Sequence, residues 1–271
     1  MGTAKLDHYV IRGGSKGHER LKVLARVMHP TTAALFDRVG ISTGLYCLDV
    51  GCGSGDVSME IARRVGPTGR VVGADIDEIK LGLARAEAQQ AGVNNVEFRF
   101  FDIRDQSKRP EFDLVYTRFL LTHLNDPAGA LNSLRQLLKK GGAIIVEDID
   151  ISGCFVHPPS RAFDRYCELY CAAVLKRGGD PNIGPRLPLL LKQAGFKEIG
   201  VSVVQPMAME GEIKVLGGAL TLENIGEAAI AEGLTTNEEV NSLVKELYEF
   251  AEDPDTLMGA PRIVQTWGSN A

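Results

Sequence analysis

The sequence Gly51-Cys52-Gly53-Ser54-Gly55 could bind a ligand through its backbone. It lies between the apolar run 46–50, which is typical of a buried strand, and the amphipathic run 56–65, which is typical of a helix. Glycine has no Cβ, so the backbone can approach a ligand closely and adopt φ angles that other residues avoid. The helix begins at once, so its unpaired N–H groups face the same crevice. A strand, a glycine turn and a helix in this order indicate the first ligand-binding loop of a doubly wound sheet.

Acidic residues close three further strands that the sequence predicts. They are Asp75, Asp102 and Glu147. In a doubly wound sheet the carboxyl ends of the strands face the ligand crevice, so we expect Asp75 and Asp102 to border the ligand of the glycine turn. Asp75 can accept hydrogen bonds from both hydroxyls of a ribose, and Asp102 can accept one from an exocyclic amine. Neither favours a phosphate, so the pattern favours a nucleoside that carries positive charge.

The elements that must position these residues alternate along the chain. We expect strands at 46–50, 70–75, 96–101, 112–116, 143–147, 199–204 and 262–267. We expect helices from 17 to Pro30 and at 31–39, 56–65, 77–91, 127–138, 160–177 and 187–194, and near 215–231 and 236–251. This alternation indicates βαβ units. The predicted fold class is α/β, a doubly wound, mostly parallel seven-stranded sheet with helical insertions that could form a lid.

Composition limits the partners. The chain has 271 residues, of which 44% are hydrophobic and 24% are charged, as is ordinary for a globular α/β protein. Its net charge of -5 argues against nucleic acid and anionic membranes as partners. No apolar run reaches the ~18 residues of a membrane span, and the N-terminus has no signal-peptide core, so we expect a cytoplasmic protein.

We predict no metal site. The five cysteines lack CxxC spacing and are expected to be buried, reduced thiols: Cys47, Cys52, Cys154, Cys167 and Cys171. Glu147, Asp148 and Asp150 cluster after the fifth strand, but no histidine completes a recognisable set of ligands. We interpret this cluster as a solvated acidic rim, with a role as a base or as metal ligands as the alternative.

Five motifs together resemble those of class I S-adenosylmethionine-dependent methyltransferases. They are Leu48-Asp49-Val50-Gly51-Cys52-Gly53-Ser54-Gly55, Val72-Gly73-Ala74-Asp75, Phe101-Asp102, Phe112-Asp113-Leu114-Val115 and Leu138-Lys139-Lys140-Gly141-Gly142. Their order and spacing resemble the family from about Tyr46 to Glu147. Within the family the chain looks most like small-molecule methyltransferases of the ubiquinone/menaquinone-biosynthesis type. The resemblance implies a Rossmann-like fold with S-adenosylmethionine as cofactor.

The resemblance also implies a role for individual positions. Four residues would surround the methionine part of the cofactor: Asp49, Gly51, Gly53 and Gly55. Four others would hold the adenosine, with Asp75 on the ribose, Ile76 against the adenine, and Asp102 with the Ile103 backbone at the adenine edge. Thr117 and Arg118 would border the sulfonium and the substrate mouth. Tyr9, Gly13 and Gly14 resemble an N-terminal lid.

We therefore expect one methyltransferase domain, 1–271. Within it, 1–44 would form the helical lid, 45–150 the cofactor-binding core, and 151–271 the substrate-side helices and C-terminal strands. His123 and Glu147 are the candidate catalytic residues, because a phenol, enol or acidic carbon would release a proton on methylation. An amine acceptor would need neither. His123 lies among leucines, so a structural, semi-buried histidine is the alternative.

The leading hypothesis is methyl transfer from S-adenosylmethionine to a small organic acceptor by in-line displacement. One alternative is an NAD(P)-dependent oxidoreductase, although Asp56 stands where the dinucleotide fingerprint has a glycine and would repel a pyrophosphate. A second alternative is a protein that binds S-adenosylmethionine without catalysis. The acceptor atom and the oligomeric state stay open, with a homodimer as one option.

Overall fold

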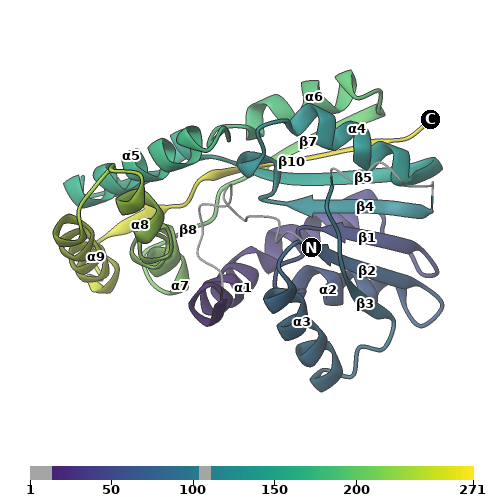
Figure 1. Ribbon diagram of the computed structural model, residues 1–271, viewed down its shortest axis with the longest axis horizontal. Helices are drawn as coiled ribbons and strands as arrows, with labels where there is room; N and C mark the ends of the chain where they lie inside the picture. Colours follow the sequence, from purple (N-terminus) through teal and green to yellow (C-terminus); the bar gives the residue numbers. More distant parts are fainter. Residues whose placement is uncertain (1–13, 104–110) are drawn as a thin grey trace.

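The structure is a computed structural model that describes residues 14–103 and 111–271, and of residues 14–16 the backbone alone. A seven-stranded sheet forms its centre (Figure 1). The strands are β1 (Tyr46–Val50), β2 (Arg70–Asp75), β3 (Val96–Phe100), β4 (Phe112–Arg118), β5 (Leu138–Asp150), β7 (Lys197–Val204) and β10 (Arg262–Ser269). Their order is β3-β2-β1-β4-β5-β10-β7.

The strand directions confirm the predicted doubly wound, mostly parallel seven-stranded sheet. β10 is antiparallel to β5 and β7, whereas β1 to β5 pair in parallel. β1 lies between β2 and β4, so the strand order reverses at β1. In such sheets ligands bind beyond the carboxyl ends of the strands at this reversal point.

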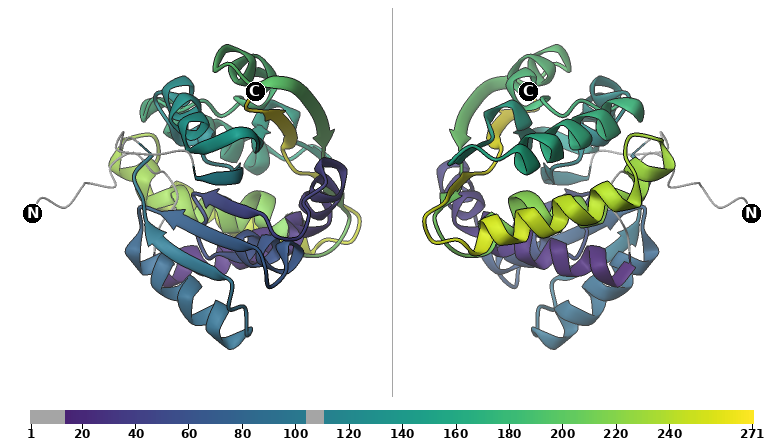
Figure 2. Two further views of the ribbon diagram at one scale, coloured as in Figure 1. Left: turned by 90° about the vertical axis from the view of Figure 1, so that its right-hand side faces the viewer. Right: turned by 90° about the vertical axis from the view of Figure 1, so that its left-hand side faces the viewer.

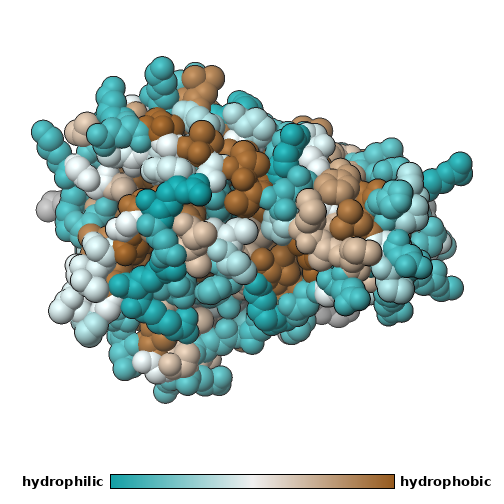
Figure 3. Space-filling view, turned by 180° about the vertical axis from the view of Figure 1, so that it is seen from behind, coloured by the Kyte–Doolittle hydropathy of each residue, from teal (hydrophilic) through white to brown (hydrophobic). Residues whose placement is uncertain are grey.

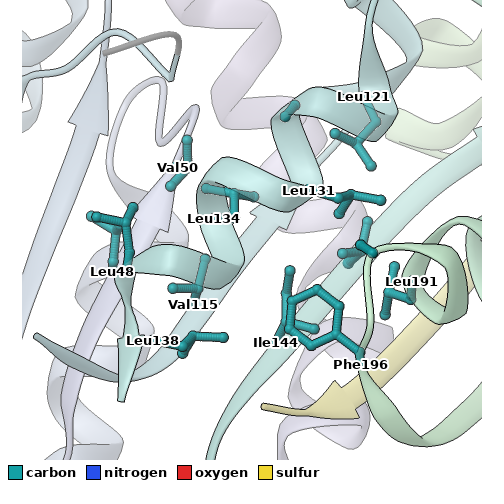
Figure 4. Packing of buried hydrophobic residues seen from close by; sticks show 14 of the residues in the cluster. Leu48, Val50, Val115, Leu121, Leu131, Leu134, Leu138, Ile144, Leu191 and Phe196 are labelled. Carbon is teal, nitrogen blue, oxygen red and sulfur yellow. The ribbon is translucent and has the colours of Figure 1, made fainter. Parts of the chain in front are cut away.

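Helices cover both faces of the sheet. α1 (Gly14–Val39), α2 (Asp56–Val65) and α3 (Glu78–Gln90) lie on one face, where their apolar side chains pack with those of β1, β2 and β4. α4 (Pro127–Leu137) and α6 (Leu187–Gln193) cover the other face. Figure 4 shows this second core, in which Leu131, Leu134 and Leu191 of the helices meet Leu48 and Ile144 of the strands.

Local sequence explains where several helices begin. The Asp77 carboxylate accepts hydrogen bonds from the backbone N–H groups of Ile79 and Lys80, which caps α3. Asp126 caps α4 in the same way, and Pro127 occupies the first turn of that helix, where a missing N–H costs nothing. The helices after β2 and β4 therefore start where the sequence predicts.

The remaining elements form a layer beyond the carboxyl ends of the strands, which we call the cap. It consists of α5 (Arg161–Lys176), α7 (Glu212–Val215), the π-helical segment η4 (Leu216–Leu220), α8 (Thr221–Ala231), α9 (Asn237–Glu252) and a small sheet of β6 (Phe155–His157), β9 (Leu257–Gly259) and β8 (Met207–Ala208). Figure 1 shows the cap at the left, and Figure 2 shows α9 across its front in the right-hand view. The cap has its own apolar core.

The structure corrects two sequence-based boundaries and adds strands that the sequence did not indicate. Pro30 was expected to end a helix, but α1 continues through it to Val39. A proline inside a helix costs ~3 kcal/mol in isolation. Here Met28 is buried on one side of the proline and Leu35 and Phe36 on the other, so packing against the sheet outweighs the lost hydrogen bond.

The second corrected boundary is the start of β5, and the added strands lie in the cap. β5 begins at Leu138 rather than at 143, because the backbone around the paired glycines already pairs with β4 through an irregular register. The strands of the cap were not predicted, since runs of two or three residues carry no periodic signal. The division into 1–44, 45–150 and 151–271 stays a prediction.

The surface mixes polar and apolar side chains. Figure 3 shows hydrophobic patches among hydrophilic residues on the face opposite to that of Figure 1. Val201 and Val203 of the edge strand β7 are among the exposed large hydrophobic residues. Across residues 14–103 and 111–271, no helix combines the length and the apolar character needed to cross a bilayer.

The glycine turn, residues 51–55, gives a test of packing. A Cβ at Gly55 would lie 2.6 Å from ring carbons of Phe98, and the φ angle of Gly55 is +80°. We expect Gly55→Ala to lower the free energy of unfolding by about 2–5 kcal/mol, from the left-handed backbone together with the overpacked ring. Urea denaturation measures the loss.

Gly40 provides the matched control for this substitution. Its φ is +82°, but in the part of the chain that the structure describes no atom beyond its chain neighbours lies within 4 Å of the position that a Cβ would occupy. Gly40→Ala should therefore cost only the backbone term of about 1–2 kcal/mol. Equal losses in the two variants would contradict the packing argument.

Candidate functional site

A cavity of about 620 Å³ lies between the carboxyl ends of the strands and the cap. Its wall is built by residues of α1, the glycine turn, the segments that follow β2, β3 and β4, and the cap. Ligand sites for small molecules typically measure ~300–1,000 Å³. The position is the one expected for the ligand of a doubly wound sheet.

The glycine turn and Asp75 form one wall. Gly51 and Gly53 line the cavity with φ angles of +74° and +54°. The backbone N–H of Gly53 donates to Asp75 Oδ2 at 3.0 Å, and that of Asp77 donates to Asp75 Oδ1 at 3.0 Å. These two bonds fix the Asp75 carboxylate at the cavity wall. A Cβ at Gly53 would lie 3.2 Å from Leu21 Cδ1, so α1 closes tightly over the turn.

Asp49 lies beneath the turn. It is only 2% exposed, yet it contributes to the cavity lining, and its Oδ2 accepts a hydrogen bond of 2.6 Å from Ser58 Oγ. Burial raises the pKa of Asp49 to about 6, although the Ser58 bond and the charge of Arg118 act in the opposite direction. This carboxylate therefore titrates close to neutral pH.

Ile76, Asp102 and Ile103 come together on a second wall. Ile76 is 45% exposed, and all three residues line the cavity beside Phe101. An exposed isoleucine and a phenylalanine next to a carboxylate offer an apolar surface with a hydrogen-bond acceptor at its edge. What this wall binds stays a prediction.

Gly55 and Thr117 lie behind the cavity wall. Gly55 packs against Phe98 and Ala84, on the side of α3. Thr117 is fully buried, and its Oγ1 donates to the backbone oxygen of Val50 at 2.9 Å. Neither residue contributes to the cavity lining, so their direct contact with a ligand stays a prediction.

Arg118 is the last residue of β4 and lines the cavity. Its Nη1 donates to Thr32 Oγ1 at 3.1 Å, and its guanidinium lies 5.6 Å from the centre of the Phe119 ring. Phe119 has a φ of +54°, which is uncommon for a residue with a bulky side chain. Such backbone strain is frequent at functional sites. Here it turns the chain directly at the cavity wall.

Glu147 has a different environment from the one expected of a catalytic base. It is fully buried, and the cavity lining does not include it. Its Oε1 accepts from Thr32 Oγ1 at 2.8 Å and from the Tyr116 hydroxyl at 2.6 Å, and its Oε2 accepts from Gln265 Nε2 at 2.8 Å. The carboxylate thus connects α1 with β4, β5 and β10. The structure favours a structural over a catalytic role.

His123 lines the cavity in the short helix η1 (Leu121–His123) and is 6% exposed. Burial lowers the pKa of His123 to about 3, with smaller effects from the positive charges of Arg20, Lys80 and Arg177. The imidazole is therefore neutral at physiological pH and is a weak base. Nearby, burial raises the pKa of Asp148 to about 7, and Asp148 accepts a hydrogen bond from the backbone N–H of Thr122.

Tyr9 and Gly13 lie outside the described residues, and Gly14 is the first residue of α1. The five cysteines are free, and burial raises the pKa of Cys47 to about 12. Among the residues that the structure describes, no cluster of three His, Cys, Asp or Glu side chains could hold a metal ion.

Sequence reasoning missed the residues that the cap and α1 bring to the cavity. They include Arg20, Leu21, Leu24, Ile213, Leu216 and Thr221. Tyr166 and Tyr170 belong both to the core of the cap and to the cavity lining. Helical spacing of aromatic residues signalled the core, but no sequence pattern indicated which aromatic residues also face a ligand.

Comparison with known proteins gives a family and relatives. Residues 41–186 match a family described as a methyltransferase domain. A ubiquinone biosynthesis O-methyltransferase of Acinetobacter baumannii is 33% identical over 116 residues, which are 42% of this chain and 48% of the relative. A ubiquinone/menaquinone biosynthesis C-methyltransferase of Enterobacter sp. is 34% identical over 136 residues, 48% of this chain and 52% of the relative. The chain thus spans about half the length of these curated relatives.

Solved structures share the fold at low identity. A phosphoethanolamine N-methyltransferase 2 of Haemonchus contortus, in complex with S-adenosyl-L-methionine, has a TM-score of 0.57 and 17% identity and covers 92% of this chain and 56% of its own. The cyclase SpnF has a TM-score of 0.54 and 19% identity and covers 88% of this chain and 80% of its own. At these identities the likeness shows the fold alone.

Substitution of the buried Glu147 should destabilise the fold. In Glu147→Gln the new amide N–H₂ would face either Gln265 Nε2, a donor that the backbone oxygen of Thr31 holds in place, or the hydroxyls of Thr32 and Tyr116, whose protons would then lose their acceptor. We expect the free energy of unfolding to fall by about 1–3 kcal/mol, as for a buried polar group that loses its partner. Urea denaturation measures it. The exposed Glu246→Gln should change stability by less than about 0.5 kcal/mol, and equal effects would refute the network.

The buried His123 should make the free energy of unfolding depend on pH. Its pKa falls from the ordinary 6.5 to about 3 in the folded protein, so between these values the unfolded chain binds a proton that the folded chain does not. The stabilisation that depends on neutral His123 is complete above pH 6.5 and is lost as the pH falls towards 3. Wild type should therefore lose about 2 kcal/mol relative to His123→Gln between about pH 7.5 and about pH 5.

Urea denaturation of both proteins at several pH values measures this difference. Asp49 and Asp148 also titrate in this range, and their raised pKa values give the opposite slope. They are present in both proteins, so their contribution cancels in the comparison. A difference that stays constant with pH would show that His123 does not keep a low pKa.

Proposed function

The chain belongs to the methyltransferase-domain family, and from this we propose that it transfers the methyl group of S-adenosylmethionine to a small organic acceptor. The observation that carries the proposal is the fixed carboxylate of Asp75 beside the glycine turn. It stands at the carboxyl end of β2, next to the wall of Ile76, Asp102 and Ile103. This arrangement suits a nucleoside that carries positive charge.

The residues at the cavity fit this cofactor. Each oxygen of Asp75 accepts one backbone hydrogen bond and keeps a further lone pair for a ribose hydroxyl. Ile76 offers its exposed face to the adenine, and Asp102 with the Ile103 backbone lies at the adenine edge. Asp49, Gly51 and Gly53 would surround the methionine part, and Arg118 would border the sulfonium. In this proposal Gly55 and Thr117 support the site from behind.

Methyl transfer depends more on the relative position of cofactor and acceptor than on a base. When bound, S-adenosylmethionine supplies a methyl group that an acceptor lone pair takes by in-line displacement as the carbon–sulfur bond breaks. The chain holds the reactants together and keeps water out, a contribution of up to ~7–11 kcal/mol. Leu24 and Met28 of α1, with Tyr166 and Tyr170 of the cap, form the apolar walls for this purpose. The low pKa of His123 makes it a weak base, so we assign it no proton transfer.

The proposal also includes the lid and the small acceptor that the sequence predicts. The part of α1 that lines the cavity supports a lid within residues 1–44, and the enclosed site supports a small acceptor over a macromolecule. Asp56 at the start of α2 also lines the cavity, and its charge disfavours the pyrophosphate of NAD(P). The negative net charge argues against nucleic acid as a partner. A cytoplasmic location and a homodimer stay predictions from the sequence.

Calorimetric titration tests the proposed function. We expect wild type to bind S-adenosylmethionine and S-adenosylhomocysteine with micromolar affinity and NAD not at all. Asp75→Asn should weaken S-adenosylhomocysteine binding by about 10–150-fold, because it removes a charged acceptor worth ~1.5–3 kcal/mol. Asp37→Asn, an exposed carboxylate that pairs with Arg64, serves as the control and should bind as wild type does.

Two results would decide against the proposal. Binding of NAD alone would return the glycine turn to the dinucleotide-binding class. Cofactor binding without methyl transfer to any of a panel of phenols, quinols, enols and amines would favour a non-catalytic protein. Unchanged affinity in Asp75→Asn would remove the ribose assignment while leaving the cofactor in place.

A further inference from the structure

The half of the cavity under the cap has an apolar and aromatic wall. Six of its side chains are Ile149, Ile151, Tyr166, Tyr170, Ile213 and Leu216. Helix α1 packs against α7, η4 and α8, and Figure 1 shows α1 beside α7 of the cap. It contributes Arg20, whose side chain lines the cavity although the residue is only 8% exposed. A guanidinium in an apolar wall needs an explanation, because burying a charge without a counter-charge is costly.

The described surroundings of Arg20 provide a hydroxyl but no counter-charge. Its Nε donates to Thr221 Oγ1 at 3.3 Å, and Thr221 Oγ1 itself donates to the backbone oxygen of Leu216 at 2.5 Å. Within residues 14–103 and 111–271, no carboxylate lies at ion-pair distance from Arg20. The neighbouring cations of α1 differ, since Lys22 pairs with Glu87 and Arg26 pairs with Glu212.

The π-helical segment η4 explains how Thr221 comes to hold Arg20. Leu216–Leu220 interrupts the regular helix between α7 and α8, and Leu216, Gly217 and Thr221 all line the cavity. π-helical turns of this kind are rare and occur frequently at functional sites. Since the Thr221 hydroxyl proton is committed to Leu216, its oxygen is oriented to accept from Nε. The two Nη groups of Arg20 then stay available to a ligand.

Arg20 contacts the cap, although its neighbour in α1 packs against the glycine turn. The next residue, Leu21, packs against Gly53, whereas Arg20 contacts Thr221 of α8. The positive charge of Arg20 also lowers the pKa of His123 and acts against the burial that raises the pKa of Tyr166 in α5. The bond to Thr221 thus holds the Arg20 side chain against α8 of the cap.

We propose that Arg20 binds an anionic group, a carboxylate or a group of similar charge and shape, on an otherwise apolar methyl acceptor. A carboxylate can accept two parallel N–H bonds from the guanidinium fork, which gives both charge and direction. The apolar wall would hold the rest of the molecule. This inference rests on the proposed function only in taking the half of the cavity under the cap as the place of the acceptor.

Calorimetric titration with pairs of acids and amides of matched shape tests the inference. The probes are 3-phenylpropanoate and 3-phenylpropanamide, cinnamate and cinnamamide, and octanoate and octanamide, each added with saturating S-adenosylhomocysteine. We expect at least one acid to bind wild type about tenfold or more tightly than its amide. Arg20→Met should remove this preference, and Arg20→Lys should keep part of it. Arg26→Met, on the same helix, should keep all of it.

Several outcomes would overturn the inference. These are equal binding of acid and amide, no binding of any acid, or a preference for the acid that survives in Arg20→Met. The amino-acid part of the cofactor is a second source of a carboxylate. Titration with S-adenosylhomocysteine, and with 5′-methylthioadenosine, which lacks that part, tests this source. If Arg20→Met loses affinity for S-adenosylhomocysteine but not for 5′-methylthioadenosine, Arg20 binds the cofactor instead.

The folding of the variants and the proposed function are checked separately. Thermal unfolding, together with S-adenosylhomocysteine affinity within about threefold of wild type, shows that Arg20→Met is folded. If S-adenosylhomocysteine does not bind wild type, the proposed function fails. The acid and amide titrations without it then still decide whether Arg20 binds an anion.

Discussion

The buried carboxylate of Glu147 holds the two halves of the site together. Three donors from distant parts of the chain meet on it: Thr32 of α1, Tyr116 of β4 and Gln265 of β10. A buried charge is tolerated only where such bonds replace water, so α1 must stay against the sheet for the network to be complete. α1 also closes the cavity over the glycine turn and carries Arg20. Together with the packing of Leu35 and Phe36, a carboxylate that does not line the cavity thus helps to place the cavity-lining residues of α1.

Much of the fold follows from local patterns. The glycine turn, the acid at the end of β2 and the alternation of strands and helices are all encoded within a few residues, which is why the sequence predicts the seven strands and the placement of Asp75 and Asp102. The walls that a ligand meets at the sheet could be assigned for the same reason. Gly55 and Thr117 show the limit of a motif. Each has the expected place in the chain, but Gly55 packs against Phe98 and the Thr117 hydroxyl bonds the backbone of Val50, so neither lines the cavity.

Long-range contacts decide what sequence reasoning missed. Pro30 should end a helix by its local chemistry, yet packing of Met28, Leu35 and Phe36 carries α1 through it. Glu147 has the position of a candidate base, and only partners more than 30 residues away reveal its structural role. Arg20 gave no signal at all, because an arginine in an amphipathic helix reads as solvent-exposed until the cap that covers it is known. Interactions of this kind have no signature within one segment.

The distribution of charge across the cavity gives the acceptor a direction. The wall at the sheet carries more acidic than basic side chains, with Asp49, Asp56, Asp75, Asp77 and Asp102 against Lys80 and Arg118, whereas Arg20 lies in the apolar wall under the cap. Opposite charges interact strongly where water is excluded, so a molecule with an anionic end is attracted to the cap and repelled from the glycine turn. Its other end is then directed towards the sheet, where the cofactor's methyl group is proposed to lie. An apolar acceptor without an anion would have no such preference, because apolar contacts alone are not directional. Arg20 would thus supply orientation, which the apolar wall cannot provide.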